Sequence, residues 1–298
     1  MGAGSADQMS EPTRTQGEIL FERYLTTQHL PFEFEKEHAG KSKRPDYTIE
    51  WNGNTVVLDV KDFDPPERLP TGFGAFDPYP RIREKVEQGR DKFKEYKECC
   101  CALVLYNLGD PFVMLHSPDI MLGSMYGDSG FTFPVNTSIG VGDASKMKQA
   151  FLGRGKMIRS NWSQAQNTTI SAIITLSTFK PHYQLLVEMI RADRTRGIEE
   201  CETELQRTVP SFDLAWEVQR VTIWHNAVAR IPFPDGLFCG PYDIHFGVLK
   251  TEDGMVGQGV TYRGKELPES VEVLRPMETF AQPEPLTRGE TRPPRRFP

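Results

Sequence analysis

Several features that would point to particular protein classes are missing from this sequence of 298 residues. It has no run of about eighteen apolar residues, the length that a membrane-spanning helix needs. The five cysteines are Cys99, Cys100 and Cys101 in a row and the isolated Cys201 and Cys239. None of their spacings is that of a zinc knuckle or a disulfide framework. We therefore expect reduced thiols and no membrane contact.

The beginning of the chain also lacks the apolar core of a secretory signal peptide. Residues 1–16 are polar and rich in small side chains, and we expect them to be disordered. Together with reduced cysteines, this favours a cytoplasmic protein. The formal net charge of −6 argues against a basic coat for duplex DNA. Local positive charge is still offered by Lys36, Lys41, Lys43 and Arg44.

The most informative stretch, residues 44–61, has the pattern of a β-hairpin. Two strand-like runs flank Asn52-Gly53, the strongest short-range indication of a two-residue type I′ turn. The expected partners are Trp51 with Asn54, Glu50 with Thr55, Ile49 with Val56, Thr48 with Val57 and Tyr47 with Leu58. One step further, Asp46 faces Asp59. Because side chains alternate along a strand, Lys61 shares their face.

Two aspartates directly opposite each other on paired strands repel, so a hairpin selected only for stability would avoid them. A divalent cation between the carboxylates turns this repulsion into a binding site. Asp46, Asp59 and Lys61 are therefore the candidate functional residues of the hairpin.

The segments around the hairpin have readable patterns of their own. We expect a helix over 17–28, a half-buried strand over 31–35, a helix from Pro80 through Lys97, and a buried strand over 101–107. The Pro- and Gly-rich segment 62–79 either closes over a substrate or is a disordered spacer.

The rest of the chain is less regular. Further strands are expected over 111–116, 168–177, 217–225 and 244–249, with residues 117–167 rich in loops. A helix is expected over most of 183–207, weakened by Gly197. From residue 261 the chain is dominated by Pro, Glu and Arg, which predicts a disordered basic tail. His116, His225 and His245 lack metal-ligand spacing and are expected to be structural.

The Pro45-Asp46 and Asp59-x-Lys61 pattern resembles the PD-(D/E)xK nuclease superfamily, with Asp59 where Glu is more usual. The resemblance implies an α/β (α+β) restriction-endonuclease-like fold, whose αβββαβ core has a mixed central sheet flanked by helices. It covers residues 17–107. Residues 108–260 would be a C-terminal α/β extension that continues the sheet or forms a second subdomain, and 261–298 the tail.

The resemblance also implies roles for individual residues. Asp46 and Asp59 would be metal ligands together with the main-chain carbonyl of Val60, and Lys61 would orient water or stabilise developing charge. Glu18 is the candidate for the first-helix acid that binds metal in many members, and Glu22 is the alternative. Gln88, followed by Lys92, is similar to a Gln-x-x-x-(Lys/Tyr) feature on the second helix of some members.

These residues predict a Mg²⁺-dependent phosphodiesterase, an endonuclease or exonuclease, with Mn²⁺ as an alternative metal. Nucleic acid is the expected partner, DNA in preference to RNA, and a homodimer stays open. A catalytically inactive relative that binds nucleic acid or assists assembly is the alternative, although the intact Asp46, Asp59 and Lys61 argue against it. A third possibility is an unrelated α/β protein whose function lies in its C-terminal half.

Overall fold

The computed structural model describes residues 14–67, 76–132, 135–136, 141–142, 148–152, 155–158, 165–251 and 254–263. Its helices are α1 (Gln16–Thr27), α2 (Pro80–Phe93), α3 (Pro118–Tyr126), α4 (Pro181–Ala192) and α5 (Ile198–Thr208). The main strands are β1 (Glu33–Phe34), β2 (Tyr47–Trp51), β3 (Asn54–Phe63), β4 (Cys100–Asn107), β9 (Ile170–Phe179), β10 (Val218–His225), β11 (Ile244–Thr251) and β12 (Gly254–Arg263). The short strands are β5 (Asp128–Thr132), β6 (Val135–Asn136), β7 (Val141–Gly142) and β8 (Lys148–Leu152).

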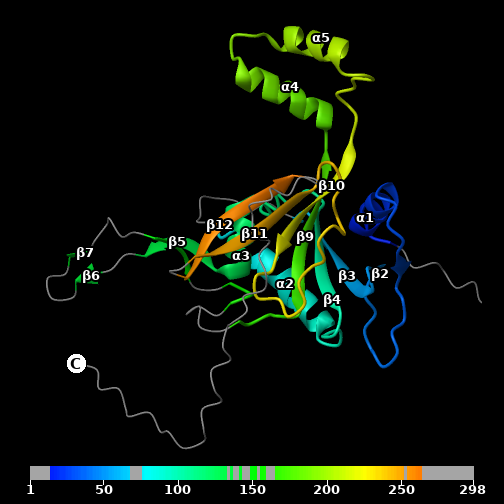
Figure 1. Cartoon of the computed structure of the whole chain (residues 1–298), viewed down its shortest axis with the longest axis vertical. Helices are drawn as coiled ribbons and strands as arrows, with labels where there is room; N and C mark the ends of the chain where they lie inside the picture. The colour runs from blue at the N-terminus through cyan, green and yellow to red at the C-terminus, as the bar shows by residue number, and fades with distance from the viewer. Residues whose placement is uncertain are drawn as a thin grey trace, which may run out of the picture.

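One mixed sheet organises these elements (Figure 1). Its eight described strands follow the order β1-β2-β3-β4-β9-β10-β11-β12. The pairs β3–β4, β4–β9 and β10–β11 are parallel, and the other neighbours are antiparallel. The strands of the second half therefore continue the sheet of the first half. The α/β class with a mixed sheet, expected from the sequence, is confirmed.

The hairpin of β2 and β3 has the register that its turn predicts. Asn52 and Gly53 have φ values of +49° and +78°, as a type I′ turn requires. All five expected pairs from Trp51–Asn54 to Tyr47–Leu58 are present. The ladder stops there, so Asp46 lies one residue before the first paired residue of β2.

Helices cover both faces of the sheet. On one face, α1 packs its apolar stripe of Leu20, Phe21, Tyr24 and Leu25 against Val56, Leu58 and Val60 of β3. On the other face, residues of α2 and α3 pack with Val57 and Phe63. Since side chains alternate along β3, Asp59 and Lys61 belong to the α2 face.

The helices α4 and α5 connect the end of β9 to the start of β10, and they project beyond that end of the sheet (Figure 1). They have a small core of their own around Leu186, Cys201 and Leu205. The helical pattern expected over 183–207 is thus two helices, because Gly197 is the N-cap of α5. No helix among the described residues is long and apolar enough to cross a bilayer.

Three sequence expectations need correction. Residues 111–116 form turns instead of a strand, because the Asn107 side chain donates to the Asp110 and Val113 carbonyls and holds the chain in a local turn. The helix from Pro80 ends at Phe93, not Lys97, since the chain turns there to bury Tyr96. The segment 117–167 includes α3, which is buried over most of its length and so lacks an amphipathic pattern.

Other sequence expectations differ at their edges or fall outside the description. The strand expected over 31–35 is only the two residues of β1. The tail expected from residue 261 begins inside β12, which ends at Arg263. The expected disorder of residues 1–16 falls mainly on residues 1–13, and that of the tail on 264–298, both outside the described residues. Residues 68–75 of the expected loop are outside them too.

Candidate active site

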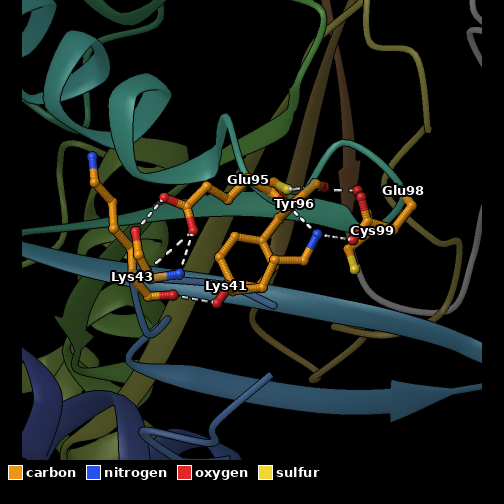
Figure 2. A network of polar contacts seen from close by, with 8 residues as sticks. Lys41, Lys43, Glu95, Tyr96, Glu98 and Cys99 are labelled. Atoms are coloured by element: carbon orange, nitrogen blue, oxygen red, sulfur yellow. Dashed lines mark hydrogen bonds and ion pairs between the residues drawn. The ribbon is translucent and has the colours of Figure 1, made fainter. Parts of the chain in front are cut away.

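The chain just before Asp46 is tied to the chain just after α2 (Figure 2). The backbone N–H of Ser42 donates to Glu95 Oε2 at 2.6 Å. Lys41 Nζ contacts both the Glu95 carbonyl and the Glu98 carboxylate, and the Tyr96 hydroxyl donates to the Lys43 carbonyl. This network holds residues 41–43, which precede Asp46, against the C-terminal end of α2.

As a result, Lys92 in the last turn of α2 lies between the two aspartates. Its ammonium donates to Asp46 Oδ1 at 2.6 Å and also to Asp59 Oδ1. Lys61 Nζ is 2.7 Å from Asp59 Oδ2. We call Asp46, Asp59, Lys61 and Lys92 the charged cluster.

Asp46 also replaces the missing end of the hairpin ladder. Its Oδ2 accepts the Val60 N–H at 2.7 Å, directly beyond the last backbone pair of β2 and β3. Its own carbonyl accepts the Glu35 N–H at 2.9 Å. Three of the four carboxylate oxygens accept hydrogen bonds, and the fourth, Asp59 Oδ2, meets Lys61 as an ion pair only.

The carboxylates of the charged cluster are more deeply buried than its ammonium groups. The Asp59 side chain is 0% exposed and that of Asp46 14%, against 20% for Lys92 and 26% for Lys61. Two negative and two positive charges balance each other. The cluster is thus an electroneutral group that solvent reaches through its lysines.

The pKa values of the two carboxyls move in opposite directions. Burial, followed by repulsion from Asp59, raises the pKa of Asp46 to about 6, against the opposing effect of Lys92. Burial also acts to raise the pKa of Asp59, but Lys92 and Lys61 outweigh it, so this pKa lies below its ordinary value. Burial lowers the pKa of Lys92, and the two aspartates raise it by more. Asp59 is therefore the first of the pair to ionise.

Glu18 is not brought to the charged cluster. It forms a capping box at the start of α1: its carboxylate accepts the Thr15 N–H at 2.7 Å, and its own N–H donates to Thr15 Oγ1. The helix α1 packs on the face of β3 opposite to Asp59 and Lys61, and this carboxylate is engaged by the backbone at the helix start. The sequence Thr15-x-x-Glu18 carries this signal, since a Thr and a Glu at that spacing are typical of a helix start.

The alternative acid, Glu22, also lies on the α1 face. It accepts the Tyr47 hydroxyl at 3.2 Å and pairs with Arg14 at 2.6 Å. Gln88 is exposed on α2, and its amide donates to Glu84 at 3.2 Å. Of the second-helix feature, only Lys92 reaches the aspartates. Sequence reasoning named Lys92 as the companion of Gln88 but did not count it among the site residues.

The basic residues before Asp46 are engaged with the protein itself. Lys36 pairs with Glu33 at 2.7 Å, Lys41 with Glu98 and Arg44 with Glu37. Lys43 Nζ donates to the Asp91 carbonyl at 2.9 Å. A phosphate would have to compete with these partners.

The donor set of the charged cluster suits a hard divalent cation only in part. The two carboxylates converge on a single positive centre, as a shared cation requires. Among the described residues, no group of three or more His, Cys, Asp and Glu side chains is arranged to hold a metal. Mg²⁺ keeps several waters, so Asp46, Asp59 and the Val60 carbonyl are a sufficient set. Lys92 would have to move.

A separate cavity of about 640 Å³ lies on the same sheet face, across β4 from Lys61. Its polar lining includes Thr175, Ser177, Thr222 and Arg220. The register places the buried Leu105 between Lys61 and Thr175. The charged cluster and this cavity are therefore distinct sites.

No family model, no curated protein and no solved structure matches this chain. The chemistry of the chain must therefore be argued from its own residues.

Proposed function

We propose that this protein is a Mg²⁺-dependent nuclease that hydrolyses phosphodiester bonds, with DNA as the expected substrate and Mn²⁺ as an alternative metal. Its first third follows the element order helix, three strands, helix, strand, which is the αβββαβ order of the restriction-endonuclease-like core. Asp46 directly precedes β2, and Asp59 and Lys61 lie on β3, at the positions of the PD-(D/E)xK pattern.

One observation carries this proposal: two carboxylates from different strands converge on a single cation in a buried site. Lys92 Nζ contacts one oxygen of each aspartate. Burying these charges is costly in a hairpin that has no use for them, because the desolvation of buried ions offsets much of their attraction.

In the proposed reaction, residues of the chain hold the metal and orient the attacking water. Asp46 and Asp59 present ionised oxygens for the metal. A bound Mg²⁺ would supply Lewis-acid activation of water and neutralise charge on the phosphate. Lys61 reaches solvent beside Asp59, where its ammonium orients the attacking water or stabilises negative charge on a phosphate oxygen.

The test is cleavage of plasmid, linear and single-stranded DNA and of RNA, with Mg²⁺, Mn²⁺ or EDTA. We expect Asp59→Asn and Lys61→Met to lower the rate by about 10²-fold or more. The matched controls are Asp91→Asn and Lys94→Met, which change the same residue types at exposed positions near the end of α2. Cleavage that persists in both site variants, or falls equally in the controls, contradicts the proposal.

The second candidate is a nuclease-fold protein that binds nucleic acid, or assists assembly, without cleaving it. The observation that favours it is the bridging position of Lys92, which already neutralises the aspartate pair. Fluorescence anisotropy with labelled DNA and RNA in EDTA separates the two candidates. Binding without cleavage in either metal supports the inactive protein.

A further inference from the structure

We infer that Lys92 is a tethered cation that holds the place of the divalent metal, so that metal binding requires its ammonium to leave the aspartate pair. This inference rests on the proposed function in assigning a metal to Asp46 and Asp59. It adds a residue that controls the metal affinity of the site.

The first argument is position. Lys92 Nζ is the one described group that touches both Asp46 and Asp59, and it touches the Oδ1 atom of each. These are the oxygens that Lys92 would give up to a metal held by Asp46 and Asp59, because the Oδ2 atoms face the Val60 N–H and Lys61. An ammonium and a metal ion cannot share this position.

The second argument is charge. With Lys61 and Lys92 in place, the two aspartates are already neutralised. A divalent ion added beside both lysines would leave two excess positive charges around the fully buried Asp59, which is unfavourable where solvent screens poorly. Departure of Lys92 removes one of these charges and frees the oxygens that a metal needs.

The third argument is freedom to move. The Lys92 side chain is 20% exposed, and a lysine has a flexible four-carbon stem. It therefore reaches water by changes in its side-chain torsions while α2 stays in place. Among the described ion pairs, Lys61 has the one with Asp59 Oδ2, which does not involve Lys92, so Lys61 remains beside the site when Lys92 leaves.

The experiment measures Mn²⁺ and Mg²⁺ binding to the full chain by isothermal titration calorimetry, without nucleic acid. Lys92→Met keeps the apolar stem and removes the charge, and we expect it to bind metal about tenfold more tightly than the wild type. Lys92→Arg keeps the charge and should bind metal no more tightly than the wild type. Lys94→Met is the matched control on an exposed lysine and should leave the affinity unchanged.

Thermal unfolding supplies a second readout. Without metal, Lys92→Met removes the described ion pair of Asp46 and leaves Asp59 paired with Lys61, so its Tm should fall, and Mn²⁺ should restore it. Asp59→Asn in the same background should abolish this rescue, because it removes a ligand. The wild type should show a smaller metal-induced shift in Tm.

Equal metal affinity in the wild type, Lys92→Met and Lys92→Arg overturns the inference, as does the absence of binding in all three. Failure of the proposed function looks different. If Lys92→Met gains metal affinity while no variant cleaves nucleic acid, the inference stands and the nuclease proposal fails. If the wild type cleaves DNA and Lys92→Met has unchanged metal affinity, the nuclease proposal stands and the inference fails.

Discussion

Two buried polar clusters among the described residues lie on opposite faces of one sheet, and they differ in how their carboxyl groups are satisfied. The charged cluster lies on the α2 face. The neutral cluster, which we define as Tyr24, His225, Asp243 and His245, lies on the α1 face among the residues that pack with α1. Each contains a buried carboxyl. Only the charged cluster neutralises its carboxyls with lysines.

In the neutral cluster, the carboxyl is satisfied by fixed neutral donors. Asp243 Oδ2 accepts the Tyr24 hydroxyl at 2.5 Å and the Gly240 N–H at 2.6 Å, and Oδ1 accepts the Val221 N–H at 3.0 Å. Burial raises the pKa of Asp243, against the effect of these donors. The arrangement ties α1 to the chain between β10 and β11.

The two histidines of the neutral cluster form a chain of their own. His245 Nε2 is 2.8 Å from the Phe238 carbonyl, and His245 Nδ1 is 3.0 Å from His225 Nε2. The carbonyl can only accept, so His245 donates through Nε2. Burial lowers the pKa of both imidazoles, so both rings are neutral at neutral pH and His245 Nδ1 accepts from the His225 N–H.

The comparison separates burial for stability from burial for chemistry. Backbone N–H groups and a buried hydroxyl cannot leave Asp243 without unfolding part of the protein. Ammonium groups on flexible stems can leave Asp46 and Asp59 and be replaced by another cation. A buried carboxylate is thus a functional candidate when its partners are exchangeable, and a structural one when they are fixed.

The largest expected effect that tests this contrast is on stability. The Asp243 carboxylate accepts hydrogen bonds from the Tyr24 hydroxyl and from two backbone N–H groups. In Asp243→Asn one carboxylate oxygen becomes an NH₂ group, so at least one of these donors loses its acceptor. We expect the free energy of unfolding to fall by about 1–3 kcal/mol, with cleavage per folded molecule retained. Urea denaturation measures the change.

Asp59→Asn is the matching variant in the charged cluster. We expect it to abolish cleavage but to lower the free energy of unfolding by less than Asp243→Asn does, because Lys61 and Lys92 can turn to solvent. If Asp59→Asn proves the more destabilising variant, the division between the two clusters is wrong.

The next effect is a loss of stability at low pH that comes from His225. Burial and the neighbouring His245 lower the pKa of His225 to about 3, while the unfolded chain binds a proton near the ordinary value of about 6.5. Stability that depends on the neutral ring is therefore present above that value and is lost as the pH falls below it.

We expect a loss of about 1 kcal/mol by pH 5.5 relative to His225→Gln, whose amide still donates to His245. Denaturation curves at pH 5.5 and 7.5 measure it. If the free energies of unfolding of the wild type and His225→Gln change equally between pH 7.5 and 5.5, His225 is not held neutral by the fold and the prediction is wrong.

The last effect also depends on pH and comes from Asp46. Its folded pKa of about 6 lies above the ordinary value, so its contribution to stability is full below about 3.9 and is lost as the pH rises through 6. Relative to Asp46→Asn, the wild type should lose about 2 kcal/mol between pH 4 and 7. The histidine pair cancels in this comparison because both proteins contain it. A difference of opposite sign would mean that Lys92 dominates the environment of Asp46.

The hairpin shows what could be predicted from the sequence and what could not. The Asn52-Gly53 turn predicted all five pairs of β2 and β3, because left-handed φ values at two adjacent residues and strict alternation are local properties. The sequence did not predict that the ladder stops before Asp46 and that the Asp46 side chain takes the Val60 N–H. It also contains Thr15-x-x-Glu18, whose spacing predicts the capping box that Glu18 forms in the structure.

The sequence by itself determined that Asp46, Asp59 and Lys61 gather at one end of a hairpin, because the sterics of a two-residue turn set their register. Only the tertiary structure decided which cation meets the two aspartates and which face receives Glu18. Lys92 is separated from Asp46 by 46 residues and from Asp59 by 33. Its contacts depend on how α2 packs across the sheet and on the network between residues 41–43 and 95–98. Packing of this kind is a property of the whole fold, so no local pattern carries it.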